Sequence, residues 1–355
     1  MKDLRIGCSC FSLISKQKNA YWFRTCDMNK DLNVWNLKSN IIHVLKGNKI
    51  EFININEIQS KYNIIGITFG KSNTRLLDGM NEKGLVGGLL FLLEGTSVNI
   101  KDIEKDDKYI KIEGMEFLTY ILSQCKDADE VEKMAKKVQI LDVDYKNISK
   151  KSTIHYTFTD QKGKNIVLEA LNNGKFTIYK NTIGVMTNSP IYQHHIENLK
   201  WFISNSLELK NGRNDIKLPK ISKMVFDGVE INGDKNAKTY LRSNIFPGSY
   251  VSYDRFIRIA VLKFLNDCGN NMEDDEILIQ GSKILSSVIV PNTKGYFYYN
   301  YLINDINVIE HDLKGTIMYG GGDDYTQYEV MYDTRKLEMY IKKEGSLNWV
   351  KITIN

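Results

Sequence analysis

The residues with the clearest chemical potential lie near the start of the chain, where Cys8 and Cys10 are separated by one residue. A cysteine at an exposed amino terminus carries a thiol with an ordinary pKa of about 8.5 and an α-amine with a pKa of about 7.7–8. One such residue can supply both nucleophile and base. It also needs an acid to hold the amine, a cation to favour the thiolate and donors for an oxyanion. Arg24 and Asp27, in the segment FRTCD, lie where a second strand could return beside the first.

Two plainer interpretations of these cysteines are a metal half-site and buried structural thiols. A metal site needs further cysteine or histidine ligands at recognisable spacings. The histidines form no CxxC or HExxH pattern, so we expect no bound metal; they are His43, His155, His194, His195 and His311. His194 and His195 are predicted to be surface or rim residues early in a helix, because adjacent helical residues face different directions. Buried structural cysteines remain the alternative to a nucleophile.

Three further patterns argue against phosphate, base-stacking and serine chemistry. The glycine run YGGGDDY (319–325) lacks the GKS or GKT ending of a phosphate loop and predicts a turn. The aromatic run GYFYYNYL (295–302) favours a strand with two packed faces over a platform for stacked bases. No GxSxG motif marks a serine nucleophile.

The elements that must position the cysteines are predicted to be strands at both ends of the chain with helices between them. Period-two and β-branched patterns predict strands in 63–70, 84–93, 154–160, 165–171 and 175–181. Apolar spacings of three and four predict helices in 114–138, 252–268 and 274–289. This order favours an α+β layered domain over a doubly wound parallel sheet. The polar stretch 207–247 is predicted to be a long loop.

Composition bounds the class of protein. The 355 residues are 42% hydrophobic and 26% charged, as in a soluble globular protein. The net charge of +5 is spread thinly, so we expect no nucleic-acid partner. No apolar run approaches the roughly 18 residues of a membrane span, and the segment MKDLRIG lacks the apolar centre of a secretory signal. The five cysteines are scattered and predict no disulfide framework, so we expect a cytoplasmic protein.

Several short motifs follow one another along nearly the whole chain. They are CSCFS with FRTCD, DGMNEKGL (78–85), HYTFTD (155–160), GVMTNSP (184–190), PGSYVSYDRF (247–256) and DYTQY (324–328). In this order they resemble the choloylglycine hydrolase family, which includes bile salt hydrolases and penicillin V acylases, and HYTFTD is similar to the penicillin V acylase branch. The resemblance implies a four-layer αββα sandwich of the N-terminal-nucleophile hydrolases, as one domain over 8–355.

The resemblance also assigns a role to each end of the opening motif. In the family, an arginine follows the nucleophilic cysteine by sixteen residues and an aspartate by nineteen. Counting back from Arg24 and Asp27 leads to Cys8 both times. The family pattern therefore implies that Cys8 is the nucleophile and Cys10 a bystander on the same strand face. It implies that Arg24 favours the thiolate and that Asp27 holds the Cys8 α-amine.

The remaining roles come from the later motifs. The resemblance implies that Asn188 donates its side-chain NH2 to the oxyanion. The backbone N–H of Phe91 would be the second donor, at a position where bile salt hydrolases carry Asn and penicillin V acylases Tyr. Arg255 corresponds to the arginine near the family's active centre. Without the resemblance, TNSP would be an ordinary turn and Arg255 a helix-surface residue. Asn81 is expected to shape a turn, and the chemistry needs neither a metal nor an organic cofactor.

The chain departs from the family pattern in three places. Residues 1–7 precede Cys8, so the α-amine is locked in a peptide bond until Gly7–Cys8 is cleaved; we expect a short propeptide that is removed. The segment 292–323 is longer than the family pattern, and Ser249 replaces an aspartate. Because the loop with Ser249 lies near the substrate pocket in the family, the resemblance implies a changed substrate specificity.

For substrate, Phe91 and HYTFTD favour penicillin V acylase-like hydrolysis of a small-molecule N-acyl amide. Trp22, Tyr250 and Tyr253 would suit an apolar acyl group. Bile salt hydrolysis is the alternative, and acyl homoserine lactones are a further possibility. An alternative of another class is an unprocessed, non-catalytic relative that serves as a binding or assembly module. By analogy with the family we expect a homo-oligomer, often a tetramer, with 207–247 as an assembly or substrate loop.

Overall fold

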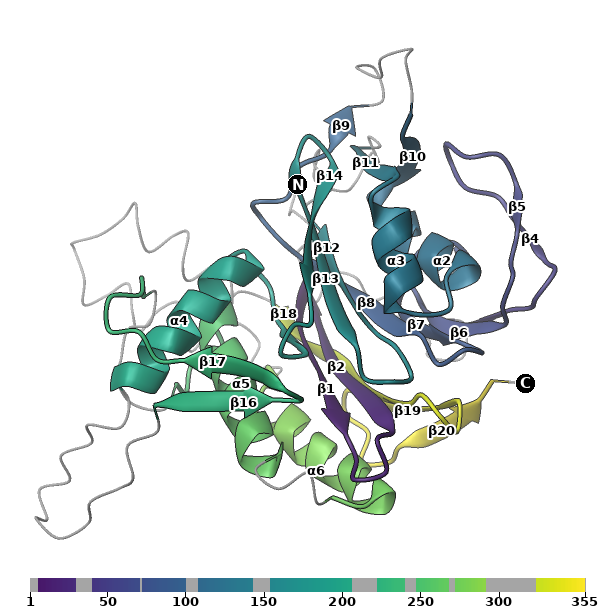
Figure 1. Ribbon diagram of the computed structural model, residues 1–355. Coiled ribbons are helices and arrows are strands. Elements are labelled where there is room, and N and C mark those ends of the chain that lie inside the picture. The colour runs from purple at the N-terminus through teal and green to yellow at the C-terminus, as the bar shows by residue number, and fades with distance from the viewer. Residues whose placement is uncertain are drawn as a thin grey trace, which may run out of the picture.

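Two β-sheets lie face to face, and helices cover the outer face of each sheet (Figure 1). This computed structural model describes residues 6–29, 40–70, 72–99, 108–142, 154–205, 222–239, 247–267, 272–291 and 324–354. Within these ranges the layers run helices, sheet, sheet, helices. The predicted α+β layered architecture is confirmed.

The smaller sheet contains both segments of the opening motif. Its strands run in the order β15 (Val185–Met186), β1 (Ile6–Ile14), β2 (Ala20–Asn29), β18 (Asp324–Asp333), β19 (Glu338–Lys343) and β20 (Val350–Thr353). All neighbours are antiparallel. The GVMTNSP, FRTCD and DYTQY segments, far apart in the sequence, are thereby brought together around β1.

The larger sheet contains the five strands predicted from the sequence. Its order is β10 (Ile110–Glu113), β11 (Val138–Asp142), β14 (Lys175–Lys180), β13 (Asn165–Asn172), β12 (Ile154–Thr159), β8 (Val86–Phe91), β7 (Leu76–Asn81), β6 (Ile64–Thr68) and β3 (Ile41–Val44), with β9 (Val98–Asn99) beside β11. The predicted hairpin joins β12 to β13. Its turn needs Gly163, which has φ +80°. A separate short pair is β4 (Lys49–Ile50) with β5 (Ile58–Gln59).

The helices divide between the two outer faces. Helices α2 (Gly114–Gln124) and α3 (Ala128–Ala135) cover the larger sheet; α4 (Tyr192–Asn205), α5 (Ser252–Asp267) and α6 (Asp274–Ser286) lie on the side of the smaller sheet. The single helix predicted over 114–138 is broken, because the Asp127 side chain accepts from the backbone N–H of Glu130 and begins a new helix. Among the described residues, no helix combines the length and the apolar character that crossing a membrane requires.

The prediction of a loop over 207–247 is wrong for part of its length. Strands β16 (Lys223–Phe226) and β17 (Val229–Asn232) form a hairpin. Asp227 and Gly228 both have positive φ, as a two-residue hairpin turn requires. The Asp227 carboxylate is 2.9 Å from the buried Lys263 ammonium on α5, which anchors the hairpin. The rest of the predicted loop, 206–221 and 240–246, lies outside the described residues, as does the segment 292–323.

One glycine lets the two sheets approach closely where chemistry is expected. A Cβ at Gly88 on β8 would lie 2.8 Å from Arg24 Nη1 and 2.8 Å from the Trp22 ring. The backbone of the larger sheet therefore comes within contact of β2 side chains. This close packing buries Arg24 completely between the sheets.

Candidate active site

The Cys8 thiol lies against the guanidinium of Arg24. Cys8 pairs with Cys26, and Cys10 with Arg24, in the antiparallel register of β1 and β2. Arg24 Nη2 is 2.9 Å from Cys8 Sγ and also donates to the Leu89 carbonyl oxygen at 2.7 Å. Its Nη1 donates to the Leu77 carbonyl oxygen. These backbone contacts from the larger sheet hold the cation against the sulfur.

The charge of Arg24 is balanced by Asp78 on β7. The two are fully buried, with Arg24 Nη1 3.4 Å from Asp78 Oδ2. Asp78 also accepts hydrogen bonds from the hydroxyls of Tyr328 and Tyr332 on β18. Burial raises the pKa of the Asp78 carboxyl, whereas Arg24 and the two hydroxyls oppose this increase. Sequence reasoning missed Asp78, although the DGMNEKGL motif begins with it.

The environment of Cys8 favours ionisation of its thiol over that of its neighbours. Burial by itself raises the pKa of the Cys8 thiol, but a hydrogen bond from Cys26 and the charge of Arg24 outweigh it, so this pKa lies below its usual value. Burial raises the pKa values of the Cys10 and Cys26 thiols instead. The Cys10 thiol contacts the Met186 carbonyl oxygen at 3.6 Å. Of the cysteines in the described residues, Cys8 therefore has the strongest tendency to form a thiolate.

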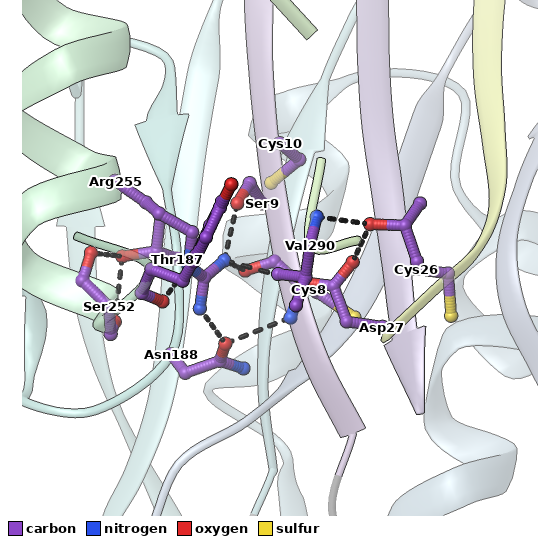
Figure 2. Close-up of polar contacts among 12 residues, drawn as sticks. Cys8, Ser9, Cys10, Cys26, Asp27, Thr187, Asn188, Ser252, Arg255 and Val290 are labelled. Carbon is purple, nitrogen blue, oxygen red and sulfur yellow. Dashed lines mark hydrogen bonds and ion pairs between the residues drawn. The ribbon is translucent and has the colours of Figure 1, made fainter. Parts of the chain in front are cut away.

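The backbone nitrogen of Cys8 is held from the other side (Figure 2). Strand β1 continues through Gly7, so this nitrogen is a peptide N–H here, and it donates to Asn188 Oδ1 at 2.8 Å. Asp27, opposite Gly7 in the register, accepts from the Thr326 hydroxyl at 2.6 Å through Oδ1. Asp27 Oδ2 has no hydrogen-bond partner among the described residues.

Arg255 on α5 joins these groups. Its Nη1 donates to the Cys8 carbonyl oxygen at 2.7 Å and to the Ser9 hydroxyl, and its Nη2 donates to Asn188 Oδ1 at 2.8 Å. Arg255 Nη1 is 3.6 Å from Asp27 Oδ2, close enough for charge attraction but too long for a hydrogen bond. Burial raises the pKa of the Asp27 carboxyl, and the Arg255 charge opposes this increase.

The amide of Asn188 has a defined orientation. Because its Oδ1 accepts from both Cys8 and Arg255, its Nδ2 must point away from them, and it lies 3.2 Å from the Phe91 carbonyl oxygen. Phe91 is at the end of β8 and its side chain is half-buried. A substrate carbonyl oxygen near Nδ2 would therefore lie beside the backbone of Phe91.

The loop that carries Asn188 is held by two buried histidines. His195 Nε2 donates to the Asn188 carbonyl oxygen at 2.8 Å, and its ring stacks on Phe256 at 4.5 Å. His155 Nε2 is 2.8 Å from the Thr187 carbonyl oxygen. The prediction that His195 is a surface or rim residue is wrong, because α5 packs over the early turns of α4 and buries it. Burial lowers the pKa of His195 to about 3, so its ring is neutral.

The structure thus brings together all six residues that the sequence predicted: Cys8, Arg24, Asp27, Phe91, Asn188 and Arg255. Asn81 closes its turn, as expected, by accepting from the backbone N–H groups of Lys83 and Leu85. Trp22 is 1% exposed and packs on the Tyr332 ring. Cys26, Thr326 and His195 were missed as members of the site.

No group of three or more metal-ligating side chains gathers in the part of the chain that the structure describes. Arg24 and Arg255 supply the positive charge around Cys8, and Asp27 the negative charge. The arrangement can therefore stabilise a thiolate, hold an amine and donate to a developing oxyanion.

Known proteins resemble this chain in both sequence and fold. Residues 8–304 match the family described as linear amide C-N hydrolases, choloylglycine hydrolase family. A bile salt hydrolase/transferase of Clostridium perfringens is 29% identical over 282 residues, covering 72% of this chain and 79% of that protein. A variant of conjugated bile acid hydrolase from the same species superposes with a TM-score of 0.68 at 23% identity, covering 98% and 93% of the two chains. Penicillin V acylase from Agrobacterium tumefaciens superposes with a TM-score of 0.64 at 17% sequence identity, and the match covers 98% of this chain and 86% of that one.

Proposed function

Because the chain belongs to the choloylglycine hydrolase family of linear amide C–N hydrolases, we propose that it cleaves N-acyl amides with Cys8 as the nucleophile. The observation that carries the proposal is the 2.9 Å contact between Arg24 Nη2 and Cys8 Sγ in a fully buried setting. A thiolate is the reactive form of cysteine, and a neighbouring guanidinium stabilises it. The match to the family also begins at Cys8.

In the acylation step, the Cys8 thiolate attacks the amide carbonyl carbon. The oxyanion that forms accepts hydrogen bonds from Asn188 Nδ2 and the backbone N–H of Phe91. The tetrahedral intermediate then expels the amine, which takes a proton from the protonated α-amine of Cys8. The acyl group is left on Cys8 as a thioester.

In the deacylation step, the neutral α-amine of Cys8 removes a proton from water, and the resulting hydroxide attacks the thioester carbonyl. The same donors stabilise the second oxyanion, and the thiolate of Cys8 leaves. The products are a carboxylic acid and an amine, so that one water is consumed for each amide. The chain returns to its thiolate and ammonium state.

This mechanism requires the Cys8 nitrogen to be free, so cleavage of Gly7–Cys8 is part of the proposal. The carboxylate that faces the bond supports it. Asp27 lies opposite Gly7, is fully buried, and its Oδ2 has no hydrogen-bond partner among the described residues. A buried carboxylate oxygen without a donor is costly. A new ammonium group on Cys8 would supply the missing donor.

The acyl group that fits best is apolar. Phe91 ends β8 and is half-buried, and Leu93, in the turn that follows, is 51% exposed. The Leu93 backbone N–H donates to the Ser189 hydroxyl at 2.7 Å, which places this apolar edge beside Asn188. An aryl or alkyl acyl chain, as in penicillin V, would lie on these side chains. Bile salts are the second candidate, because a relative at 29% identity is a bile salt hydrolase/transferase.

The deciding experiment combines intact mass, amino-terminal sequencing and an activity panel. We expect the wild-type chain to begin at Cys8 and to hydrolyse at least one of penicillin V, glycine-conjugated bile salts and acyl homoserine lactones. The Cys8→Ala variant should retain residues 1–7 and be inactive. The matched Cys10→Ala variant, two positions along the same strand, should be processed and active. A wild-type chain that keeps residues 1–7 and still hydrolyses these amides would rule out the free-amine mechanism.

The cellular setting and assembly state complete the proposal. The four described cysteines, Cys8, Cys10, Cys26 and Cys125, are all free thiols, which suits a reducing compartment such as the cytoplasm. A homotetramer is supported by analogy with the family alone. Light scattering of the processed chain measures this directly.

A further inference from the structure

A second cysteine lies directly against the proposed nucleophile. Cys26 on β2 is the cross-strand partner of Cys8 in the β1–β2 register, so the two side chains share one face of the sheet. Arg24 Nη2 contacts both sulfurs, at 2.9 Å for Cys8 and 3.8 Å for Cys26. Both thiols are completely buried. Figure 2 shows the two side chains side by side on neighbouring strands.

The two thiols of this pair differ in acidity. Burial by itself raises the pKa of the Cys8 thiol, but the adjacent Cys26 thiol and the charge of Arg24 bring this pKa below its usual value, whereas the neighbouring Cys8 raises the pKa of Cys26. Burial raises the pKa of Cys26 further. The other charged or titratable groups facing the pair are Arg24 on β2, Asp27 on β2, Asp78 on β7, Tyr328 on β18 and Cys10 on β1. Of these, Arg24 is the cation that favours the charged form of Cys8.

We propose that Cys26 is a positioning residue that donates its S–H hydrogen to the Cys8 sulfur and so stabilises the thiolate together with Arg24. This inference rests on the proposed role of Cys8 as the nucleophile. The guanidinium holds the sulfur from one side with an N–H donor, and the thiol holds it from the opposite strand. Two donors at fixed angles leave a defined side of the sulfur for attack on a carbonyl carbon.

A purely structural role for Cys26 predicts different behaviour. A buried cysteine can serve as a small apolar side chain, and valine then replaces it well while serine is unfavourable. A donor role predicts the reverse for the chemistry of Cys8, because serine keeps a hydrogen-bond donor and valine does not. Cys26→Ser, Cys26→Val and the smaller Cys26→Ala therefore separate the two roles.

The measurement is the rate of alkylation of Cys8 by iodoacetamide between pH 5 and pH 10, read from the mass of the peptide that contains Cys8. It requires no substrate, and a reductant keeps all thiols reduced before each reaction. The midpoint of the rate-against-pH curve gives the pKa of the Cys8 thiol. In Cys26→Val and Cys26→Ala we expect this midpoint to rise by about one pH unit, so that alkylation near neutral pH is about tenfold slower. Cys26→Ser should restore most of the wild-type midpoint.

Cys10→Val is the matched control, because Cys10 is also buried beside Cys8 and Arg24 but contacts the Met186 carbonyl oxygen. It should leave the Cys8 midpoint within a few tenths of a unit. Cooperative thermal unfolding identifies the variants that fold, and the alanine variant serves if valine is too large. An unchanged midpoint in a folded Cys26→Ala or Cys26→Val variant overturns the inference. So does an equal shift in the serine variant.

The outcome is separable from that of the proposed function. If the wild-type chain hydrolyses amides through Cys8 but the Cys26 variants show no shift, this inference alone fails. If the shift is found in a chain that does not hydrolyse amides, the proposed function fails and the thiol pair stands.

Discussion

Arg255 fixes the orientation of the Asn188 amide: its Nη2 lies 2.8 Å from Asn188 Oδ1 and therefore turns Asn188 Nδ2 toward Phe91. The same oxygen also accepts from the Cys8 backbone nitrogen at 2.8 Å. If the Asn188 amide were flipped, its NH2 group would face the N–H donors of Cys8 and Arg255, and no acceptor would be present for them. The two donors therefore exclude the flipped orientation. The Nδ2 end of Asn188 therefore has one orientation, toward the Phe91 carbonyl oxygen to which it donates.

The donor and acceptor ends of Asn188 can be tested separately. Asn188→Ala removes both, and we expect turnover to fall by about 10² to 10³-fold, as for loss of one oxyanion donor. Asn188→Asp keeps an acceptor for Cys8 and Arg255 but loses the donor, so its turnover should fall at least as far. The measurement is kcat on the best substrate of the panel. Near wild-type turnover in the aspartate variant would show that Asn188 acts only by holding Cys8.

Arg255 itself should matter for turnover more than for binding. A lysine cannot reach Cys8 O, Asn188 Oδ1 and Tyr250 O at once, whereas the guanidinium does. Misplacement of the Asn188 donor by about 1 Å is expected to lower kcat by roughly 10²-fold. The variant is Arg255→Lys, and its matched control is Arg258→Lys, one turn further along α5. Arg258 Nη1 donates to the carbonyl oxygens of Pro247 and Ser249 and not to Asn188. Equal losses of kcat in both variants would contradict this role of Arg255.

Local patterns in the sequence were sufficient for much of the fold. Alternating residues in 154–181 predict β12, β13 and β14, and their turns contain glycine at the expected places. The FRTCD segment returns beside Cys8 because a hairpin of two consecutive strands, β1 and β2, is the simplest arrangement for it. The order of the motifs supports the resemblance to the family, and that resemblance predicts that the six site residues lie together. These successes depend on features that lie close together in the chain, or on a resemblance that spans it.

The parts that could not be predicted depend on tertiary contacts. Tyr328 and Tyr332 are 250 and 254 residues from the Asp78 carboxylate that they donate to. The burial of His195 depends on α5, which begins far along the chain at Ser252. A histidine at the start of an amphipathic helix shows no local sign of such a cover. The Asp-Gly pair at 227–228, between the short apolar runs of KMVF and VEIN, is a local signal for the β16–β17 hairpin, but the polar composition of 207–247 as a whole predicts a loop.

The Asp78 network should be a main source of stability. Asp78→Asn leaves the buried Arg24 guanidinium without its carboxylate, and loss of one partner of a buried pair costs about 3–5 kcal/mol. Tyr332→Phe removes one hydroxyl donor while Tyr328 and Arg24 still face Asp78, so it should cost about 1 kcal/mol. Urea unfolding monitored by fluorescence gives both values. Equal costs in the two variants would contradict the assignment of Asp78 as the counter-ion of Arg24.

His195 predicts a pH dependence of stability that one substitution removes. In the unfolded chain this ring takes up a proton near its ordinary pKa of 6.5, whereas burial lowers the folded pKa to about 3. Between these values only the unfolded chain binds the proton. The contribution of the neutral ring is therefore complete above about pH 6.5 and declines as the pH falls toward 3.

The variants His195→Phe and His195→Gln divide this effect into its parts. Phenylalanine keeps the stacking on Phe256 but loses the hydrogen bond to the Asn188 carbonyl oxygen. The free energy of unfolding of His195→Phe at pH 7.5 should therefore be lower than that of the wild type by about 1–3 kcal/mol. Glutamine can still donate and should recover part of that loss. Neither side chain titrates, so the difference between wild type and either variant should shrink by up to about 1.4 kcal/mol per pH unit below 6.5. Parallel stability curves for wild type and His195→Phe from pH 7.5 to pH 4.5 would show that the buried ring is not the titrating group.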